Sequence, residues 1–368
     1  MINQNDKIFV AKPFLPPIGE YIQYLEKIWE TDILTNMGPL HQQFEQELKS
    51  RFGWKNISLF TNGHLALEIA LKTMDLEAGS EIITTPYTFV STTASIVNQG
   101  FVPVFCDIGD NCTIATEQIE SLITEKTAAI LPVHVYGIPC DVDGIEKIAA
   151  KHRLKVLYDA AHAIGVKYKG RDISSYGDIS MFSFHATKLF HTIEGGALVY
   201  SDSKLQKHID LSKNFGISGP ESIELIGMNA KMNEFQSAMG LVLIRHFDYI
   251  VSQRKAIYNR YVDNLNGQNN IKILKTDEDT FYNYAYMPVL FKADRDRIFK
   301  CLEEKNIYAR KYFYPCISDV ECYKKYLRGN SLAKSQKAAE QIITLPIYPQ
   351  LTIEQVDYIC EVIADAFQ

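Results

Sequence analysis

The sequence lacks an excess of positive charge, paired cysteine motifs and long hydrophobic runs. Its 38 lysines and arginines stand against 44 aspartates and glutamates, so the basic surface that nucleic-acid binding requires is absent. The seven cysteines are scattered and none lies in a C-x-x-C pair, which argues against a disulfide framework and a metal site. No apolar run approaches the roughly 18 residues of a membrane span, and the opening MINQNDKIFVAKPFLPP has no signal-peptide pattern. We therefore expect a cytoplasmic chain without nucleic-acid or membrane partners.

What is present is enough apolar material for a large core, arranged in an alternating pattern. Hydrophobic residues make up 46% of the 368 positions, and this length favours one large domain with a smaller second one. Between residues 55 and 200, short β-branched or aromatic runs such as KVLYDA and ISMFSF alternate with helical patterns. This alternation predicts a mostly parallel α/β sheet with helices on both faces. A ligand is then expected at the carboxyl ends of the strands.

The pattern changes after residue 200. We expect a long helix over about 230–264, a strand over FYNYAYMPVLF (281–291) and further helices toward the end of the chain. This change predicts a large domain with an N-terminal arm over 1–245 and a small α+β domain over 246–368. No long Gly, Ser or Pro linker separates them, so we expect the two parts to pack together.

Three candidate residues or segments follow the predicted strands. Asn62 and Gly63 open a helix, whose free N–H groups either bind a phosphate or belong to an ordinary capped helix. Asp159 ends a buried strand, where it either pairs with a protonated heterocyclic nitrogen or caps the next helix. Lys188 lies shortly after MFSF, and is either a Schiff-base nucleophile of lowered pKa or a solvated loop lysine.

These three signals converge on one cofactor. Pyridoxal phosphate needs N–H donors for its phosphate, a carboxylate for its pyridine nitrogen and a lysine for its aldehyde. Ser183 offers a hydroxyl for the same phosphate, and Tyr87 and Phe89 offer aromatic rings to stack on the cofactor. Together the residues predict a pyridoxal-phosphate enzyme.

A family resemblance makes this prediction specific. The ordered segments TNGHLAL, PYTFVSTTASIVNQGFVPVFCDI, PVHVYGIPCD, YDAAHAIG, GDISMFSFHATKLFHTIEGGALV, GMNAKMNEFQSAMGL and LPIYPQLT resemble the DegT/DnrJ/EryC1/StrS family of nucleotide-sugar aminotransferases over nearly the whole chain. The resemblance implies the type I fold of pyridoxal-phosphate enzymes, related to aspartate aminotransferase, and a homodimer with shared active sites.

The resemblance also implies a role for each candidate residue. Lys188 would form the Schiff base and move the proton, and Asp159 would pair with the pyridinium nitrogen. The other implied cofactor-binding residues are Phe89 on the ring, Gly63, His64 and Ser183 at the phosphate, His162 beside the ring hydroxyl, and Asn229 reaching the phosphate in the partner's site. Sugar-contacting candidates are His185, Glu194, Tyr312 and Tyr314.

The substrate follows from finer features of the same resemblance. Relatives that dehydrate sugars replace the lysine with histidine, whereas this chain keeps Lys188. The segment SFHATK resembles members that act at C4 of the hexose. We therefore expect transfer of the amino group of L-glutamate to dTDP-4-keto-6-deoxyglucose, for synthesis of a surface polysaccharide such as the O-antigen of lipopolysaccharide. The alternatives are a C3-acting or GDP-linked sugar aminotransferase, and a regulatory protein of the same fold without turnover.

Overall fold

The computed structural model describes residues 7–367. A seven-stranded sheet forms its centre, in the order β2-β10-β9-β6-β5-β3-β4. β10 runs antiparallel to its neighbours β9 and β2, and the remaining pairs are parallel. The mostly parallel sheet predicted from the alternating pattern is therefore confirmed. Its strands are β2 (Ile57–Phe60), β3 (Glu81–Thr84), β4 (Val102–Phe105), β5 (Thr127–Leu131), β6 (Lys155–Asp159), β9 (Ile179–Ser183) and β10 (Gly196–Tyr200).

Helices cover both faces of this sheet, because successive strand residues point to opposite sides and both sides are apolar. In β6, Val156 and Tyr158 belong to the core on one face, whereas Leu157 belongs to the core on the other. The first face packs against α2 (Pro39–Phe52), α5 (Thr116–Leu122), α6 (Val142–His152) and α8 (Glu234–Arg245), and the second against α3 (Gly63–Thr73), α4 (Val90–Asn98) and α7 (Leu205–Ser212).

The C-terminal part is built on a three-stranded antiparallel sheet in the order β13-β15-β17. Its core includes Tyr87 and Tyr136 of the large sheet's loops, so the two parts share one packed interior. The elements are α9 (Phe247–Leu265), β13 (Ile271–Ile273), β15 (Met287–Phe291), α10 (Arg295–Glu304), α11 (Ala333–Gln341), β17 (Ile342–Leu345) and α12 (Ile353–Asp365). The predicted division at residue 245 falls at the end of α8 and stays a prediction.

Two predicted elements differ from the structure. The helix expected over 230–264 is broken at His246 (φ −92°, ψ 0°), whose ring lies 3.1 Å from the Glu20 carboxylate. The strand expected over 281–291 begins at Met287, because Tyr284 adopts a positive φ of 56° and turns the preceding residues out of the sheet. Periodicity alone could not report either interruption.

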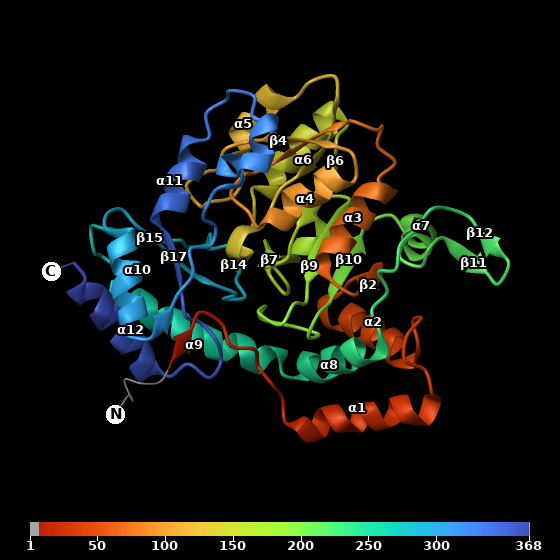
Figure 1. The fold of residues 1–368 in the computed structure, drawn as a ribbon, viewed down its shortest axis with the longest axis horizontal. Coiled ribbons are helices and arrows are strands. Elements are labelled where there is room, and N and C mark those ends of the chain that lie inside the picture. Colours follow the sequence, from red (N-terminus) through yellow and green to blue (C-terminus); the bar gives the residue numbers. More distant parts are fainter. Residues whose placement is uncertain (1–6, 368) are drawn as a thin grey trace.

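The N-terminal segment crosses the whole molecule (Figure 1). β1 (Ile8–Phe9) pairs in parallel with β16 (Ile307–Tyr308) of the C-terminal part. The chain then runs beneath α9 and α8 to α1 (Ile18–Thr31) at the opposite end (Figure 1).

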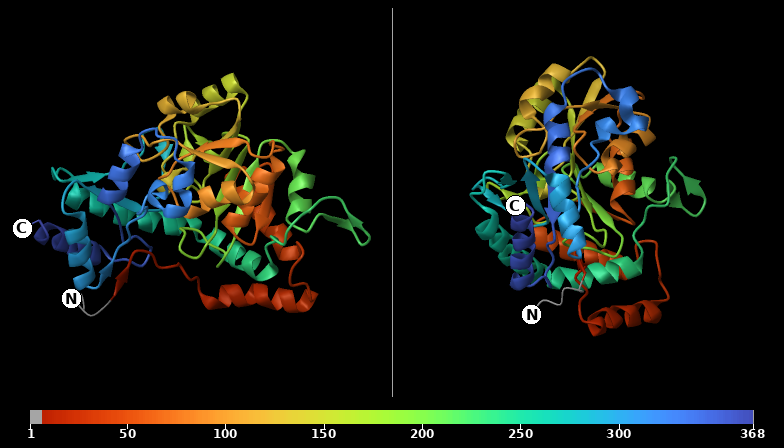
Figure 2. Two further views of the ribbon diagram at one scale, coloured as in Figure 1. Left: turned by 45° about the horizontal axis from the view of Figure 1, so that its top comes forward. Right: turned by 60° about the vertical axis from the view of Figure 1, so that its left-hand side comes forward.

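A two-stranded hairpin, β11 (Ile217–Gly219) with β12 (Ser222–Ile223), projects from the body near α7 in each view (Figures 1 and 2). A small sheet of β14 (Thr280–Phe281), β7 (Lys167–Tyr168) and β8 (Arg171–Asp172) lies beside the main one. Within residues 7–367, no helix combines the length and hydrophobicity that crossing a membrane requires.

Candidate active site

A cavity of about 610 Å³ lies at the carboxyl ends of β6 and β9, where the parallel sheet predicts a ligand. The loop after β9 and two segments of the C-terminal part complete its walls. Of the predicted site residues, the structure brings ten to this cavity: Gly63, His64, Phe89, Asp159, His162, Ser183, His185, Lys188, Glu194 and Tyr312.

Asp159 is a buried carboxylate at the floor of the cavity. Its Oδ2 accepts a hydrogen bond from the Thr92 hydroxyl at 2.8 Å, and its Oδ1 accepts one from the Ala161 backbone N–H at 3.1 Å. Burial raises the pKa of this carboxyl, while the Thr92 hydrogen bond and the charge of Lys188 oppose the rise. No cationic side chain of residues 7–367 forms a salt bridge with it. A protonated ring nitrogen bound in the cavity would supply the missing counter-charge.

Lys188 faces the same floor from the loop that follows β9. Its Nζ donates a hydrogen bond to the Tyr286 hydroxyl at 3.4 Å. Burial of the ammonium end lowers the pKa of Lys188 to about 8, against the opposing charge of Asp159. A larger fraction of neutral amine is therefore present near neutral pH than a solvated lysine offers, and neutral amine is the form that acts as nucleophile or base.

The start of α3 forms one side of the cavity. Asn62 caps the helix, its Oδ1 accepting from the Leu65 N–H at 2.8 Å. A Cβ placed on Gly63 would lie 3.2 Å from the Cβ of Ser183, so glycine lets the helix start approach the end of β9. The open N–H groups, the helix dipole and the Ser183 hydroxyl together suit a phosphate.

Two further predicted residues flank the floor. Phe89 directly precedes α4 and leaves 57% of its surface exposed, which makes its ring available for stacking. The Nδ1 of His162 accepts a hydrogen bond from the Tyr136 N–H at 3.0 Å. Burial, aided by the charge of Lys188, lowers the pKa of His162 well below its usual value, so this ring stays neutral.

Other predicted residues lie at the mouth or along the wall of the cavity. His185 and Glu194 face each other at the mouth, with Nε2 and Oε1 3.4 Å apart. His64 is held on α3 by Ser91 and Glu68, at 2.8 Å and 3.2 Å.

Asn229 and Tyr314 do not line the cavity of their own chain. Asn229 lies beside Asn214 and accepts a hydrogen bond from Lys231, and Tyr314 stacks under the Arg295 guanidinium.

Sequence reasoning missed Tyr286 and Thr92. Tyr286 stands in the segment that was expected to be a strand, and no local pattern indicated that its hydroxyl would meet a lysine 98 positions earlier. A weak sequence signal pointed to Thr92 as a site residue, because it follows Phe89 in the first turn of a helix that begins at the same cavity.

Three features of the residues that line the cavity fit pyridoxal phosphate. An unpaired buried carboxylate stands at one end, an open helix start with a serine hydroxyl stands at another, and a lysine of lowered pKa faces both. Fold and site together define a type I pyridoxal-phosphate enzyme.

The chain belongs to the DegT/DnrJ/EryC1/StrS aminotransferase family, whose profile matches residues 18–364. It is 40% identical to the dTDP-4-amino-4,6-dideoxy-D-glucose transaminase of Shigella dysenteriae over 363 residues, covering 97% of this chain and 98% of that protein. The protein of the same description from Escherichia coli is 41% identical, with coverages of 95% and 96%. A solved structure of DesI in the presence of its TDP-sugar product superposes with a TM-score of 0.93 at 27% identity, covering 100% of this chain and 94% of that chain.

Proposed function

We propose that this chain transfers the amino group of L-glutamate to the C4 keto group of dTDP-4-keto-6-deoxyglucose. The product is dTDP-4-amino-4,6-dideoxyglucose, which we assign to the synthesis of a surface polysaccharide such as an O-antigen. The observation that carries the proposal is the 40% identity, over 97% of the chain, to a transaminase of that description. The retained Lys188, with its lowered pKa, supports an active aminotransferase over a regulatory protein without turnover.

Pyridoxal phosphate is the cofactor, and when bound it supplies an aldehyde carbon that can take up an amino group and a ring that acts as an electron sink. Lys188 would hold its aldehyde carbon and then, once released, move a proton through its Nζ. The pKa of about 8 keeps this nitrogen able both to accept and to return a proton near neutral pH.

The remaining residues would hold the cofactor in the cavity and orient its ring. Asp159 would keep a proton on the ring nitrogen, since its buried carboxylate has no other cationic partner among the described residues. The start of α3 and Ser183 would bind the phosphate, and Phe89 would cover the ring. His162 stays neutral and, because its Nδ1 accepts from the Tyr136 N–H, its Nε2–H would donate to the ring hydroxyl.

We propose further that two copies of the chain share their active sites. The hairpin projects from the body (Figure 2) and exposes three isoleucines, Ile217, Ile223 and Ile226, which a second copy would cover. Asn229, at the base of the hairpin, keeps its amide oxygen on Lys231 at 3.0 Å. Its amide N–H groups are then the end that would reach a phosphate in the partner's site.

The test is to incubate the protein with pyridoxal phosphate, L-glutamate and dTDP-4-keto-6-deoxyglucose and to locate the new amine by NMR. We expect an amine at C4 with the glucose configuration. An amine at C3, or reaction only with a GDP-linked sugar, would overturn the acceptor assignment. Conversion of the cofactor by glutamate without any sugar product would leave the donor reaction standing and refute this acceptor.

A further inference from the structure

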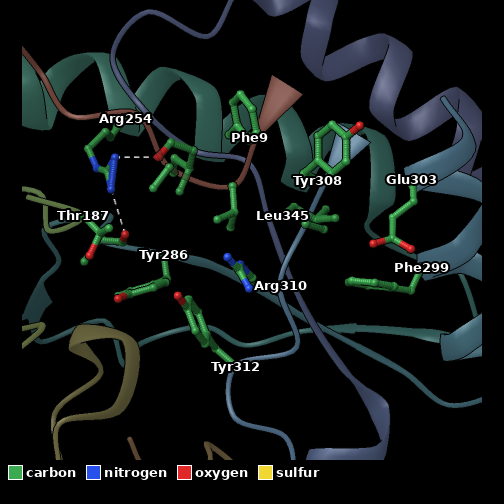
Figure 3. A pocket seen from close by; sticks show the side chains of 15 residues that line it. Phe9, Thr187, Arg254, Tyr286, Phe299, Glu303, Tyr308, Arg310, Tyr312 and Leu345 are labelled. Carbon is green, nitrogen blue, oxygen red and sulfur yellow. Dashed lines mark hydrogen bonds between the residues drawn. The ribbon is translucent and has the colours of Figure 1, made fainter. Parts of the chain in front are cut away.

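A second cavity of about 410 Å³ adjoins the active site (Figure 3). Thr187, Tyr286 and Tyr312 line both cavities, so a molecule bound at Lys188 can extend into the second one. The outer walls come from the N-terminal segment, α10, β16 and β17. None of the roles assigned above uses this space.

Two arginines line the second cavity, and they differ in what they bind. Arg254 is buried and donates to the backbone carbonyls of Tyr284, Ala285 and Ile347, at 3.1, 2.8 and 2.6 Å, so each of its three nitrogens already has a partner. The exposed guanidinium of Arg310 forms no hydrogen bond or ion pair with any side chain or backbone group of residues 7–367. Arg310 is therefore the cation available to a ligand.

The charge of Arg310 acts on the same side chain as that of Lys188. Burial raises the pKa of Tyr312, and the charges of Arg310 and Lys188 both oppose that rise. The Tyr312 hydroxyl thus lies in the field of both cations. In Figure 3 the Arg310 guanidinium points toward Tyr286 and Tyr312 and away from Glu303. Since the Lys188 Nζ contacts the Tyr286 hydroxyl at 3.4 Å, the cationic side of the second cavity is the side that faces the active site.

Much of the rest of the lining is apolar and suits a short aliphatic chain. Phe9, Phe299 and Leu345 form much of the wall, and methylene groups gain from burial against such side chains. A single guanidinium matches one carboxylate through two parallel hydrogen bonds. A diphosphate carries more charge than one arginine neutralises, and Glu303 in the same lining would repel it more strongly than it repels a single carboxylate.

We propose that Arg310 binds the side-chain carboxylate of the amino donor, while the donor's amino group lies at Lys188. The donor is accordingly a short dicarboxylic amino acid, as L-glutamate is. This inference rests on the proposed aminotransferase function and adds the residue that selects the donor.

The experiment compares the holoenzyme with its Arg310→Gln, Arg310→Lys and Arg297→Gln variants. Arg297 is a matched control, because it is an exposed arginine of α10 that pairs with Asp294 and lies outside both cavities. Without any sugar present, conversion of the cofactor to its amine form is followed by absorbance against the concentration of L-glutamate. L-Glutamine is the comparison donor, since it has the same length and lacks only the charge. Binding of glutarate, a dicarboxylate without an amino group, is measured by calorimetry.

We expect Arg310→Gln to raise the apparent Kd for L-glutamate and for glutarate at least about tenfold, since hydrogen bonds between charged groups are worth this much or more. The preference for glutamate over glutamine is lost in that variant, is partly kept in Arg310→Lys and is unchanged in Arg297→Gln. The second half-reaction is measured separately, from the amine form of the cofactor and dTDP-4-keto-6-deoxyglucose. In Arg310→Gln we expect the KM for this sugar to stay within twofold of the wild-type value.

A preference for glutamate that survives Arg310→Gln would overturn the proposal, and so would an equal loss with both donors. A loss of activity confined to the half-reaction with the keto sugar would overturn the proposal and assign the cavity to the sugar acceptor. If the wild type reacts with L-glutamate and not with this sugar, the acceptor proposal fails while the donor arm still reports on Arg310. No reaction of the wild type with L-glutamate would overturn both.

Discussion

Lys188 is partly buried and Lys213 is fully buried, and the chain uses these two lysines in opposite ways. Lys213 is 1% exposed and forms a salt bridge with Asp210, Nζ to Oδ1 at 2.9 Å, beside the ring of Phe60. Lys188 faces a cavity, has no carboxylate within salt-bridge distance among the described residues, and contacts only a neutral hydroxyl at 3.4 Å. The difference in partners separates a structural lysine from a reactive one.

The chain leaves charge uncompensated at the cavity and compensates it around Lys213. Asp210 also accepts from Ser58 at 3.0 Å and from Gln206 at 2.7 Å, so the network around Lys213 is satisfied internally. Asp159 and Lys188 are left for a ligand to satisfy. Groups that are held in a folded state at a cost to its stability are expected at functional sites.

The largest effect is expected from Lys188→Ala. Removing the Nζ abolishes the group that moves the proton, and we expect transamination to fall by about a thousandfold or more. Steady-state assays with L-glutamate measure this change. Lys213→Ala serves as the contrast and should retain measurable turnover in protein that remains folded. Substantial turnover in Lys188→Ala would refute the role of this lysine.

A second prediction concerns stability and its pH dependence in the cofactor-free chain. Burial lowers the pKa of Lys188 from 10.5 to about 8, so the folded chain binds its proton less tightly than the unfolded chain does. The charged lysine therefore lowers the free energy of unfolding, and this loss of stability is fully present below pH 8, where it amounts to about 3 kcal/mol. It shrinks as the pH rises from 8 to 10.5, and is below about 1 kcal/mol at pH 10.

Lys188→Met should therefore stabilise the chain at pH 7 and lose most of this gain at pH 10, as measured by urea unfolding at both values. Lys213→Met should instead destabilise the chain, by about 1–3 kcal/mol, because it leaves Asp210 without its cation. A gain for Lys188→Met that is equal at the two pH values would contradict the assignment of the shift to this lysine.

A third prediction follows from the carboxylate opposite Lys188. Asp159→Asn keeps the shape of the side chain and its contacts with Thr92 while removing the charge, so we expect turnover to fall by about a hundredfold. The cofactor-free variant should be more stable than the wild type at neutral pH, since burial raises the pKa of this carboxyl and the folded chain carries the cost of its charge. Unchanged turnover would show that Asp159 does not serve a bound cation.

The smallest effect is expected from Tyr286→Phe. Its hydroxyl contacts the Lys188 Nζ at 3.4 Å, beyond the usual length of a strong hydrogen bond. We expect kcat to fall by about two- to tenfold, with little change in KM for the sugar. The basic limb of the kcat–pH profile should shift, because the lysine loses a hydrogen-bond partner. A profile identical to that of the wild type would assign Tyr286 a packing role.

Much of this site follows from the sequence, because the residues that end parallel strands must lie together. Asp159 and Ser183 end the neighbouring strands β6 and β9, and Lys188 follows a few residues later. The pattern of strands along the chain is therefore enough to predict that all three lie at one edge of the sheet. These residues together already predict pyridoxal phosphate, and the family resemblance added the substrate class.

The C-terminal contribution could not be predicted in the same way. Tyr286 and Arg310 reach the cavities from a part of the chain whose position depends on how the two sheets pack. The positive φ of Tyr284 that turns the chain out of β15 leaves no periodic signal. The break between α8 and α9 likewise has no local signal, because no proline or glycine stands at His246, whose ring contacts Glu20 far away in the sequence.

The pairing of β1 with β16 also bears on how the protein is made. Ile8 pairs with Ile307, so β1 leaves the ribosome long before its partner strand does. Contacts between such distant residues carry a large loop-closure cost. The wall that Phe9 gives to the second cavity can be complete only once the residues of β16 have been synthesised.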